Sequence, residues 1–144
     1  MTEMEIMLRQ DVDPDPEFYY RQQFKIYIEP YLLWDRSTWE AVLATGTVYR
    51  IEVDGRYAGN AILEGKRKGT RLIVDFGLLP EYRGKGIGKA ALEQVTRMGK
   101  RFTAVTRKEV VDFFQKSGFI LRRKVKNYYD LGVDGYYIIF EKDR

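Results

Sequence analysis

The 144-residue sequence contains no cysteine and no histidine. The lack of cysteine excludes disulfides, a thiolate nucleophile and cysteine-based metal sites. The lack of histidine removes the commonest general base and a common transition-metal ligand, so we expect no metal centre. Apolar runs are far shorter than a membrane span, and residues 1–10 lack a basic flank followed by an apolar run. We therefore expect a soluble, cytoplasmic protein with no membrane partner.

The formal net charge is +4. A charge of this size suits an anionic ligand but does not by itself indicate nucleic acid. The basic segment 122–126 is typical of the solvated face of an edge strand, where lysine discourages aggregation, so we expect no nucleic-acid partner. A nucleic-acid role resting on this segment is the alternative, and it would predict binding that weakens steeply with salt.

The length predicts one domain over residues 1–144. Patterning predicts seven strands and four helices in a mixed α+β order. The expected strands are 4–8, 47–53, 56–64, 71–79, 102–106, 119–126 and 136–141, and the expected helices begin at Pro16, Ser37, Ile87 and Lys108.

Several local features are predicted along the chain. Asp54-Gly55 favours a two-residue hairpin turn, and residues 65–69 predict a second hairpin tip. Ser37-Thr38-Trp39-Glu40 has the pattern of a capping box. An aromatic-rich stripe at helical spacing predicts the buried face of the first helix; its members are Tyr20, Phe24, Tyr27, Ile28 and Tyr31.

A strand, a glycine-rich turn and a helix follow one another at residues 71–98. Apolar residues alternate at Leu72, Val74, Phe76 and Leu78, which predicts a strand with one buried face. Glycine tolerates positive φ and lets a ligand approach the backbone. The start of the helix at Ile87 would bind an anion such as pyrophosphate through its free N–H groups. A tight turn with solubilising basic residues is the alternative.

Two nucleotide-binding motifs are excluded in this stretch. The Walker pattern ends in Gly-Lys-Ser/Thr, whereas Gly88-Lys89-Ala90 carries no hydroxyl for magnesium. The dinucleotide fingerprint requires the order G-x-G-x-x-G, whereas this turn has a glycine at every second position from 84 to 88.

Arg83, Gly86 and Gly88 match Gln/Arg-x-x-Gly-x-Gly/Ala, and the stretch resembles the acyl-CoA signature of the GNAT superfamily of N-acetyltransferases. The element order and the segment 110–119 extend this resemblance over nearly the whole chain. The resemblance implies a GNAT-type α+β fold in α/β/α layers, with a mostly antiparallel mixed sheet. It also implies acetyl-CoA as cosubstrate and a monomer or homodimer.

By this resemblance, the backbone of Leu78 and Leu79 would pair with the pantetheine arm, and the turn from Arg83 to Lys89 would hold the pyrophosphate. The implied cofactor site consists of Leu78, Leu79, Arg83, Gly84, Lys85, Gly86, Ile87, Gly88, Lys89, Arg107 and Phe114. Phe114 stands where the family often has a tyrosine, so it can pack against the cofactor but cannot donate a proton. Arg107 replaces a frequent asparagine and could reach a phosphate.

The segment Asn127-Tyr128-Tyr129 and Trp34 are similar to parts of N-terminal protein acetyltransferases, including those acting on ribosomal-protein alanine. The resemblance places Trp34, Tyr128 and Tyr129 on the acceptor side. Deprotonating an α-amino group at neutral pH costs roughly 3–4 kcal/mol less than deprotonating lysine, which favours a protein or peptide N-terminus. A small-molecule amine and a non-catalytic acyl-CoA-binding module are the alternatives, and acetylation of an aminoacyl-tRNA, resting on the basic segment 122–126, is a third.

Acetyl transfer to an amine needs a base, an oxyanion donor and an acid. Asp75 is the first candidate base, with Glu64 and Glu52 as weaker alternatives; a solvated or cross-strand paired carboxylate is an equal interpretation of Asp75. We expect the Leu78 N–H to face the thioester oxygen. Tyr128, or else its neighbour at 129, is the candidate acid.

Overall fold

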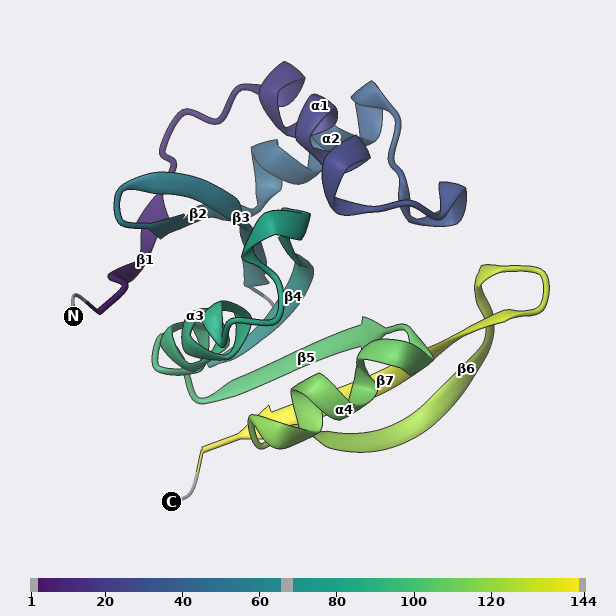
Figure 1. The fold of residues 1–144 in the computed structure, drawn as a ribbon. Helices are drawn as coiled ribbons and strands as arrows, with labels where there is room; N and C mark the ends of the chain where they lie inside the picture. Colours follow the sequence, from purple (N-terminus) through teal and green to yellow (C-terminus); the bar gives the residue numbers. More distant parts are fainter. Residues whose placement is uncertain (1–2, 66–68, 143–144) are drawn as a thin grey trace.

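The computed structural model describes residues 3–65 and 69–142. Seven strands form one sheet in the spatial order β1-β2-β3-β4-β5-β7-β6. Four helices cover it, α1 and α2 on one face and α3 and α4 on the other (Figure 1). Among the described strands only β4 and β5 pair in parallel. The expected α+β class with a mostly antiparallel mixed sheet is confirmed.

The strands are β1 (Ile6–Gln10), β2 (Thr47–Val53), β3 (Arg56–Gly65), β4 (Thr70–Leu78), β5 (Arg101–Thr106), β6 (Ile120–Asp130) and β7 (Val133–Glu141). The helices are α1 (Pro16–Ile26), α2 (Arg36–Thr45), α3 (Ile87–Thr96) and α4 (Lys108–Lys116), with short 3₁₀ turns η1 (Pro30–Leu32) and η2 (Pro80–Tyr82). The first strand lies two residues later than predicted, and the two closing strands are longer. The bounds of α4 agree with the prediction.

The β2–β3 hairpin forms as predicted. Asp54 and Gly55 have φ of 51° and 81°, the positive values that a two-residue turn of this kind needs. The predicted second tip includes residues 66–68, which lie outside the described residues.

The predicted buried face of α1 is wrong. Phe24 and Ile28 are 53% and 85% exposed, whereas Tyr19, Gln23 and Ile26 are buried. The helix also ends at Ile26, before part of the predicted stripe. The buried face is fixed by tertiary hydrogen bonds: the Tyr19 hydroxyl donates to Asp11 at 2.6 Å, and the Gln23 side chain binds the backbone of the α1–α2 loop.

The predicted capping box of α2 is also wrong. The helix begins one residue earlier, at Arg36, and Asp35 is its N-cap. The Asp35 carboxylate accepts hydrogen bonds from the Thr38 N–H at 2.8 Å and the Ser37 hydroxyl at 3.0 Å. Asp35 therefore takes the N-cap position that the sequence pattern predicts for Ser37, and it accepts from a different N–H of the first turn.

Strand β4 does not have the simple alternation that was predicted. Leu63 pairs with Ile73 and Ile62 pairs with Asp75, so Val74 is an extra residue, a β-bulge. The bulge reverses the alternation. Val74 packs under α1 and α2, whereas Ile73 and the predicted residues Phe76 and Leu78 pack toward α3 and α4. Both faces of the strand are covered.

The centre of the sheet opens beyond a short parallel region. Strands β4 and β5 pair only from Thr70 to Leu72, opposite Arg101 to Thr103, and then diverge (Figure 1). The divergence leaves the C-terminal end of β4 unpaired on the β5 side.

At the edge of the sheet farthest from β1, β6 carries the basic segment 122–126, whose side chains are mostly exposed. This exposure is as expected for a solvated edge strand.

Candidate functional site

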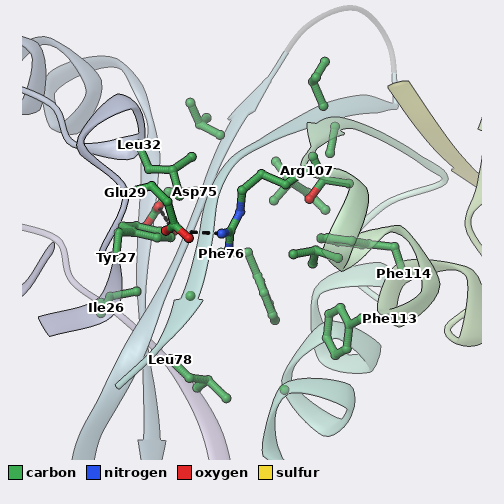
Figure 2. A pocket seen from close by; sticks show the side chains of 18 of the residues that line it. Ile26, Tyr27, Glu29, Leu32, Asp75, Phe76, Leu78, Arg107, Phe113 and Phe114 are labelled. Carbon is green, nitrogen blue, oxygen red and sulfur yellow. Dashed lines mark hydrogen bonds and ion pairs between the residues drawn. The ribbon is translucent and has the colours of Figure 1, made fainter. Parts of the chain in front are cut away.

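A cavity of about 820 Å³ lies in the opening between β4 and β5. Its walls come from the α1–α2 loop, β4, the turn before α3, helix α4 and the β6–β7 region. Figure 2 shows side chains from the two sides meeting across it. The cavity thus brings together segments that the sequence analysis assigned separately to cofactor and acceptor.

The glycine-rich turn forms one end of this cavity. Gly84 and Gly86 have φ of 74° and 80°, so both need the left-handed conformation that glycine tolerates. The first hydrogen bond of α3 runs from the Ala90 N–H to the Gly86 carbonyl at 3.1 Å, so the preceding N–H groups at 87–89 have no partner in the helix. A Cβ on Gly86 would meet nothing within 4 Å. This open helix start can receive an anion.

Gly88 has a different role from the other two glycines. It lies inside α3, and a Cβ there would come within 3.3 Å of the Phe113 ring. Ile87 is fully buried in the core, whereas Lys85 and Lys89 are exposed beside the turn. Ile87, Lys85 and Lys89 therefore do not line the cavity itself, although both lysines add positive charge near its glycine-rich end.

Leu78 presents its backbone to the cavity. The Leu79 N–H donates to Ala58 of β3 at 2.8 Å. Because successive residues of a strand direct their N–H and C=O groups to opposite sides, those of Leu78 point away from β3 toward the opening. Leu79 is buried and outside the lining, so the structure brings only Leu78 of this pair into the cavity.

Arg83 is held by the protein's own carbonyls. Its guanidinium donates to the Leu78 carbonyl, at 3.2 Å from Nε and 3.0 Å from Nη2, and also to the Ile26 carbonyl at the end of α1. The side chain predicted to approach the pyrophosphate therefore links the end of β4 to the end of α1.

Asp75 lies on the face of β4 opposite to the side chains of Phe76 and Leu78, and it is only 7% exposed. Its Oδ1 accepts a hydrogen bond from the Tyr27 hydroxyl at 2.6 Å, and its Oδ2 accepts one from Asn60 Nδ2 at 3.5 Å. Burial raises the pKa of Asp75 to about 6, although both hydrogen bonds act to lower it. The carboxyl is thus buried rather than solvated, and a pKa of about 6 leaves it mostly ionised at neutral pH.

Aromatic side chains form the wall near the α1–α2 loop. Trp34 packs against Trp39 with ring centroids 4.8 Å apart, and Tyr129 packs against Tyr31 at 5.9 Å. The Tyr129 hydroxyl donates to the Val105 carbonyl at 3.1 Å, and burial raises its pKa. Tyr128 is 51% exposed. The three predicted acceptor residues, Trp34, Tyr128 and Tyr129, all line the cavity.

The remaining two predicted residues lie on the β5–α4 side. Arg107 Nη1 is 3.4 Å from the Glu29 carboxylate, and this ion pair crosses the cavity in Figure 2. Phe114 is 4% exposed and packs on Phe113 and Phe119. Arg107 is therefore paired with a carboxylate from the opposite wall, and Phe114 contributes an apolar surface.

Three residues of the site escaped the sequence analysis: Tyr27, Glu29 and Asn60. Tyr27 belongs to the aromatic stripe that helical spacing predicts as core. The sequence does carry a signal for Asn60, because it is a polar residue within an apolar strand. In the structure it is 1% exposed, and a buried polar side chain needs hydrogen-bond partners. The weaker base candidates point elsewhere, since Glu52 pairs with Arg9 and Glu64 bonds to Thr45.

Two further properties concern only the described ranges, 3–65 and 69–142. No three acidic side chains in them gather closely enough to hold a metal ion. None of their helices combines the length and apolar character needed to cross a membrane.

A search of curated proteins gave no match. Many solved structures match, among them the ribosomal-protein-S18-alanine N-acetyltransferase from Escherichia coli (TM-score 0.80, 16% identity, 97% of this chain and 96% of that chain). Arabidopsis thaliana NAA60 in complex with acetyl-CoA has TM-score 0.75 and 16% identity over 96% and 100% of the chains. IAA acetyltransferase from Bacillus cereus has TM-score 0.74 and 18% identity over 96% and 100%.

These likenesses show a shared fold. The model of the acetyltransferase (GNAT) family matches residues 6–119, well over half of the sequence. The cavity of this chain lies between an open helix start after the glycine-rich turn and an unpaired end of β4. The chain therefore belongs to the acetyltransferase (GNAT) family.

Proposed function

We propose that this protein transfers the acetyl group of acetyl-CoA to the α-amino group at the N-terminus of a protein or peptide. One observation supports this most strongly. A single cavity has the backbone edge of Leu78 and the open start of α3 on one side, and the buried carboxyl of Asp75 on the other. The likeness to the Escherichia coli enzyme for ribosomal-protein alanine agrees with the proposed acceptor.

The cavity suits acetyl-CoA, which would supply the activated acetyl group as a thioester. The N–H groups at the start of α3 would bind the pyrophosphate, and Lys85 and Lys89 would add charge nearby. Phe113 and Phe114 offer an apolar wall for the pantetheine arm. The Leu78 N–H would stabilise negative charge that develops on the thioester oxygen.

Asp75 would accept the proton that the acceptor's ammonium must lose before it can attack. Its pKa of about 6 leaves it ionised at neutral pH yet closer to the amine's pKa than an ordinary aspartate, which favours general base catalysis. Both oxygens already accept one hydrogen bond, but a carboxylate can accept about four. Tyr128 would donate the proton that the leaving thiolate takes up.

The acceptor would lie against Trp34, Tyr128 and Tyr129. Asp75 is a weaker base than the amines it would serve, so an α-amino group with a pKa of about 7.7–8.0 is a better match than lysine at about 10.4. A small-molecule amine is the alternative acceptor. A non-catalytic acyl-CoA-binding module is the second alternative, because Phe114 cannot donate a proton.

The test combines a thermal shift with acetyl-CoA and mass spectrometry of possible acceptors. Acetyl-CoA at about 100 times its Kd should stabilise the fold by about 2.7 kcal/mol. Each peptide carries one internal lysine and is supplied with either a free or a blocked N-terminus, and a set of small amines is run beside them.

We expect acetylation only of peptides with a free N-terminus. Product on the blocked peptides would move the acceptor to lysine, and product on the small amines alone would establish the first alternative. A thermal shift without any product would favour the binding module. No thermal shift would remove acetyl-CoA from the proposal.

A further inference from the structure

A chain of polar side chains, from the half-buried Tyr57 to the buried Asn60, runs behind Asp75, away from the cavity. The Tyr57 hydroxyl donates to the Asn60 Oδ1, and the Asn60 Nδ2 donates to Asp75 Oδ2 at 3.5 Å. These groups lie between α1 and the sheet, where the Tyr57 ring packs on Phe18 with centroids 5.0 Å apart. Asn60 is 1% exposed, so water does not compete for its amide.

The two ends of the Asn60 amide face different partners. A hydroxyl donor contacts its oxygen, and a carboxylate contacts its nitrogen. Burial raises the pKa of Tyr57, which keeps that hydroxyl protonated and able to donate. If the amide were reversed, its oxygen would face Asp75, and only a protonated carboxyl could then donate to it.

We propose that Tyr57 and Asn60 are positioning residues for acetyl transfer. The Tyr57 hydroxyl fixes the Asn60 amide with its NH₂ group toward Asp75, and this contact favours the ionised carboxylate that accepts the proton. The inference rests on the proposed function for its catalytic consequence, but the effect on Asp75 is a property of the folded protein alone.

Other groups also face Asp75. Tyr27, from the end of α1, donates to Oδ1. Arg107, from the start of α4, and Glu29, from the α1–α2 loop, face the same cavity and form an ion pair with each other. None of these groups contacts Oδ2 in the way that Asn60 does, so the effect of the amide can be tested separately.

The experiment compares wild type with Tyr57→Phe, which removes one hydroxyl and keeps the packed ring. Carbon-13 NMR of the Asp75 carboxyl gives its pKa without any substrate, and the pH dependence of kcat/KM gives the acid limb of the reaction. Both are expected to rise by up to about one pH unit, because the Asn60 amide is no longer fixed and its hydrogen bond to the charged carboxylate, worth about that much, is weakened. Asn60→Ala, which deletes the amide, is expected to raise both at least as far.

Tyr19→Phe is the matched control. It also removes a tyrosine hydroxyl between α1 and the sheet, here from α1 itself, but that hydroxyl donates to Asp11 and accepts from Arg50. It is expected to leave both the Asp75 pKa and the acid limb unchanged.

The inference is overturned if the Asp75 pKa stays the same in both Tyr57→Phe and Asn60→Ala, or if Tyr19→Phe moves it equally. If the Asp75 pKa rises but the acid limb of kcat/KM does not change, Tyr57 and Asn60 do act on the carboxyl, and Asp75 is not the base. The two proposals can therefore fail separately.

Discussion

Asp75→Asn should change how the stability of the protein depends on pH. Burial raises the pKa of Asp75 to about 6 from an ordinary value of 3.8. The folded protein therefore binds this proton more tightly than the unfolded chain does. That contribution to stability is fully present below pH 3.8 and is lost as the pH rises through 6. The asparagine variant has no such proton and loses nothing over this range.

The expected size follows from the pKa difference of about two units, at about 1.4 kcal/mol per unit. The free energy of unfolding of Asp75→Asn, relative to wild type, should thus rise by about 3 kcal/mol between pH 3.5 and pH 7. A constant offset is also expected, because the amide changes the hydrogen bonds with Tyr27 and Asn60. This offset cancels when values at different pH are compared.

Urea unfolding at a series of pH values, followed by the fluorescence of Trp34 and Trp39, measures this difference. Other carboxyls titrate in both proteins and cancel as well. The variant Asp112→Asn removes a carboxylate that is 75% exposed and gives the baseline for the loss of one negative charge. A difference for Asp75→Asn that stays within about 0.5 kcal/mol of this baseline at every pH would refute the burial argument.

Three further variants test other parts of the site. Gly86→Leu should abolish the thermal shift with acetyl-CoA, because the leucine side chain would enter the space the ligand needs. Gly55→Leu, at a similar positive φ and equally open, is the control and should keep the shift. Equal loss of the shift in both variants would mean that the substitutions act on folding. Arg83→Met should lower the free energy of unfolding by about 1–2 kcal/mol, measured by urea titration, since it loses its bonds to the Leu78 carbonyl and to the end of α1. Tyr128→Phe should lower kcat and leave the acetyl-CoA shift intact, and an unchanged kcat would exclude Tyr128 as the acid.

Features set by neighbouring residues were predictable from the sequence. The Asp54-Gly55 hairpin depends on the geometry of its turn. The bounds of α4 depend on the local spacing of apolar residues and on the glycine that ends the helix. The turn from Arg83 to Gly88 was predictable for the same reason, since two of its glycines need positive φ. The element order then sufficed for the α+β class.

Features set by distant contacts were not predictable. The buried face of α1 depends on Asp11 and on the backbone near Trp34, which a helical period does not contain. The bulge at Val74 is a property of the pairing between β3 and β4. It also decides which side of the sheet Asp75 faces, so the partners of that carboxyl could be found only in three dimensions.

The short parallel region of β4 and β5 has a consequence for protein engineering. The first ninety-six residues supply β1 to β4 with three of the helices, and the chain from β5 onward supplies the other three strands with α4. The two parts meet in the sheet along only three residue pairs. A chain break in the turn at 97–100 would thus yield two fragments, each continuous in sequence and in the sheet. Because the cavity has walls from both, a ligand bound there would hold the fragments together, and their reassociation would report its concentration.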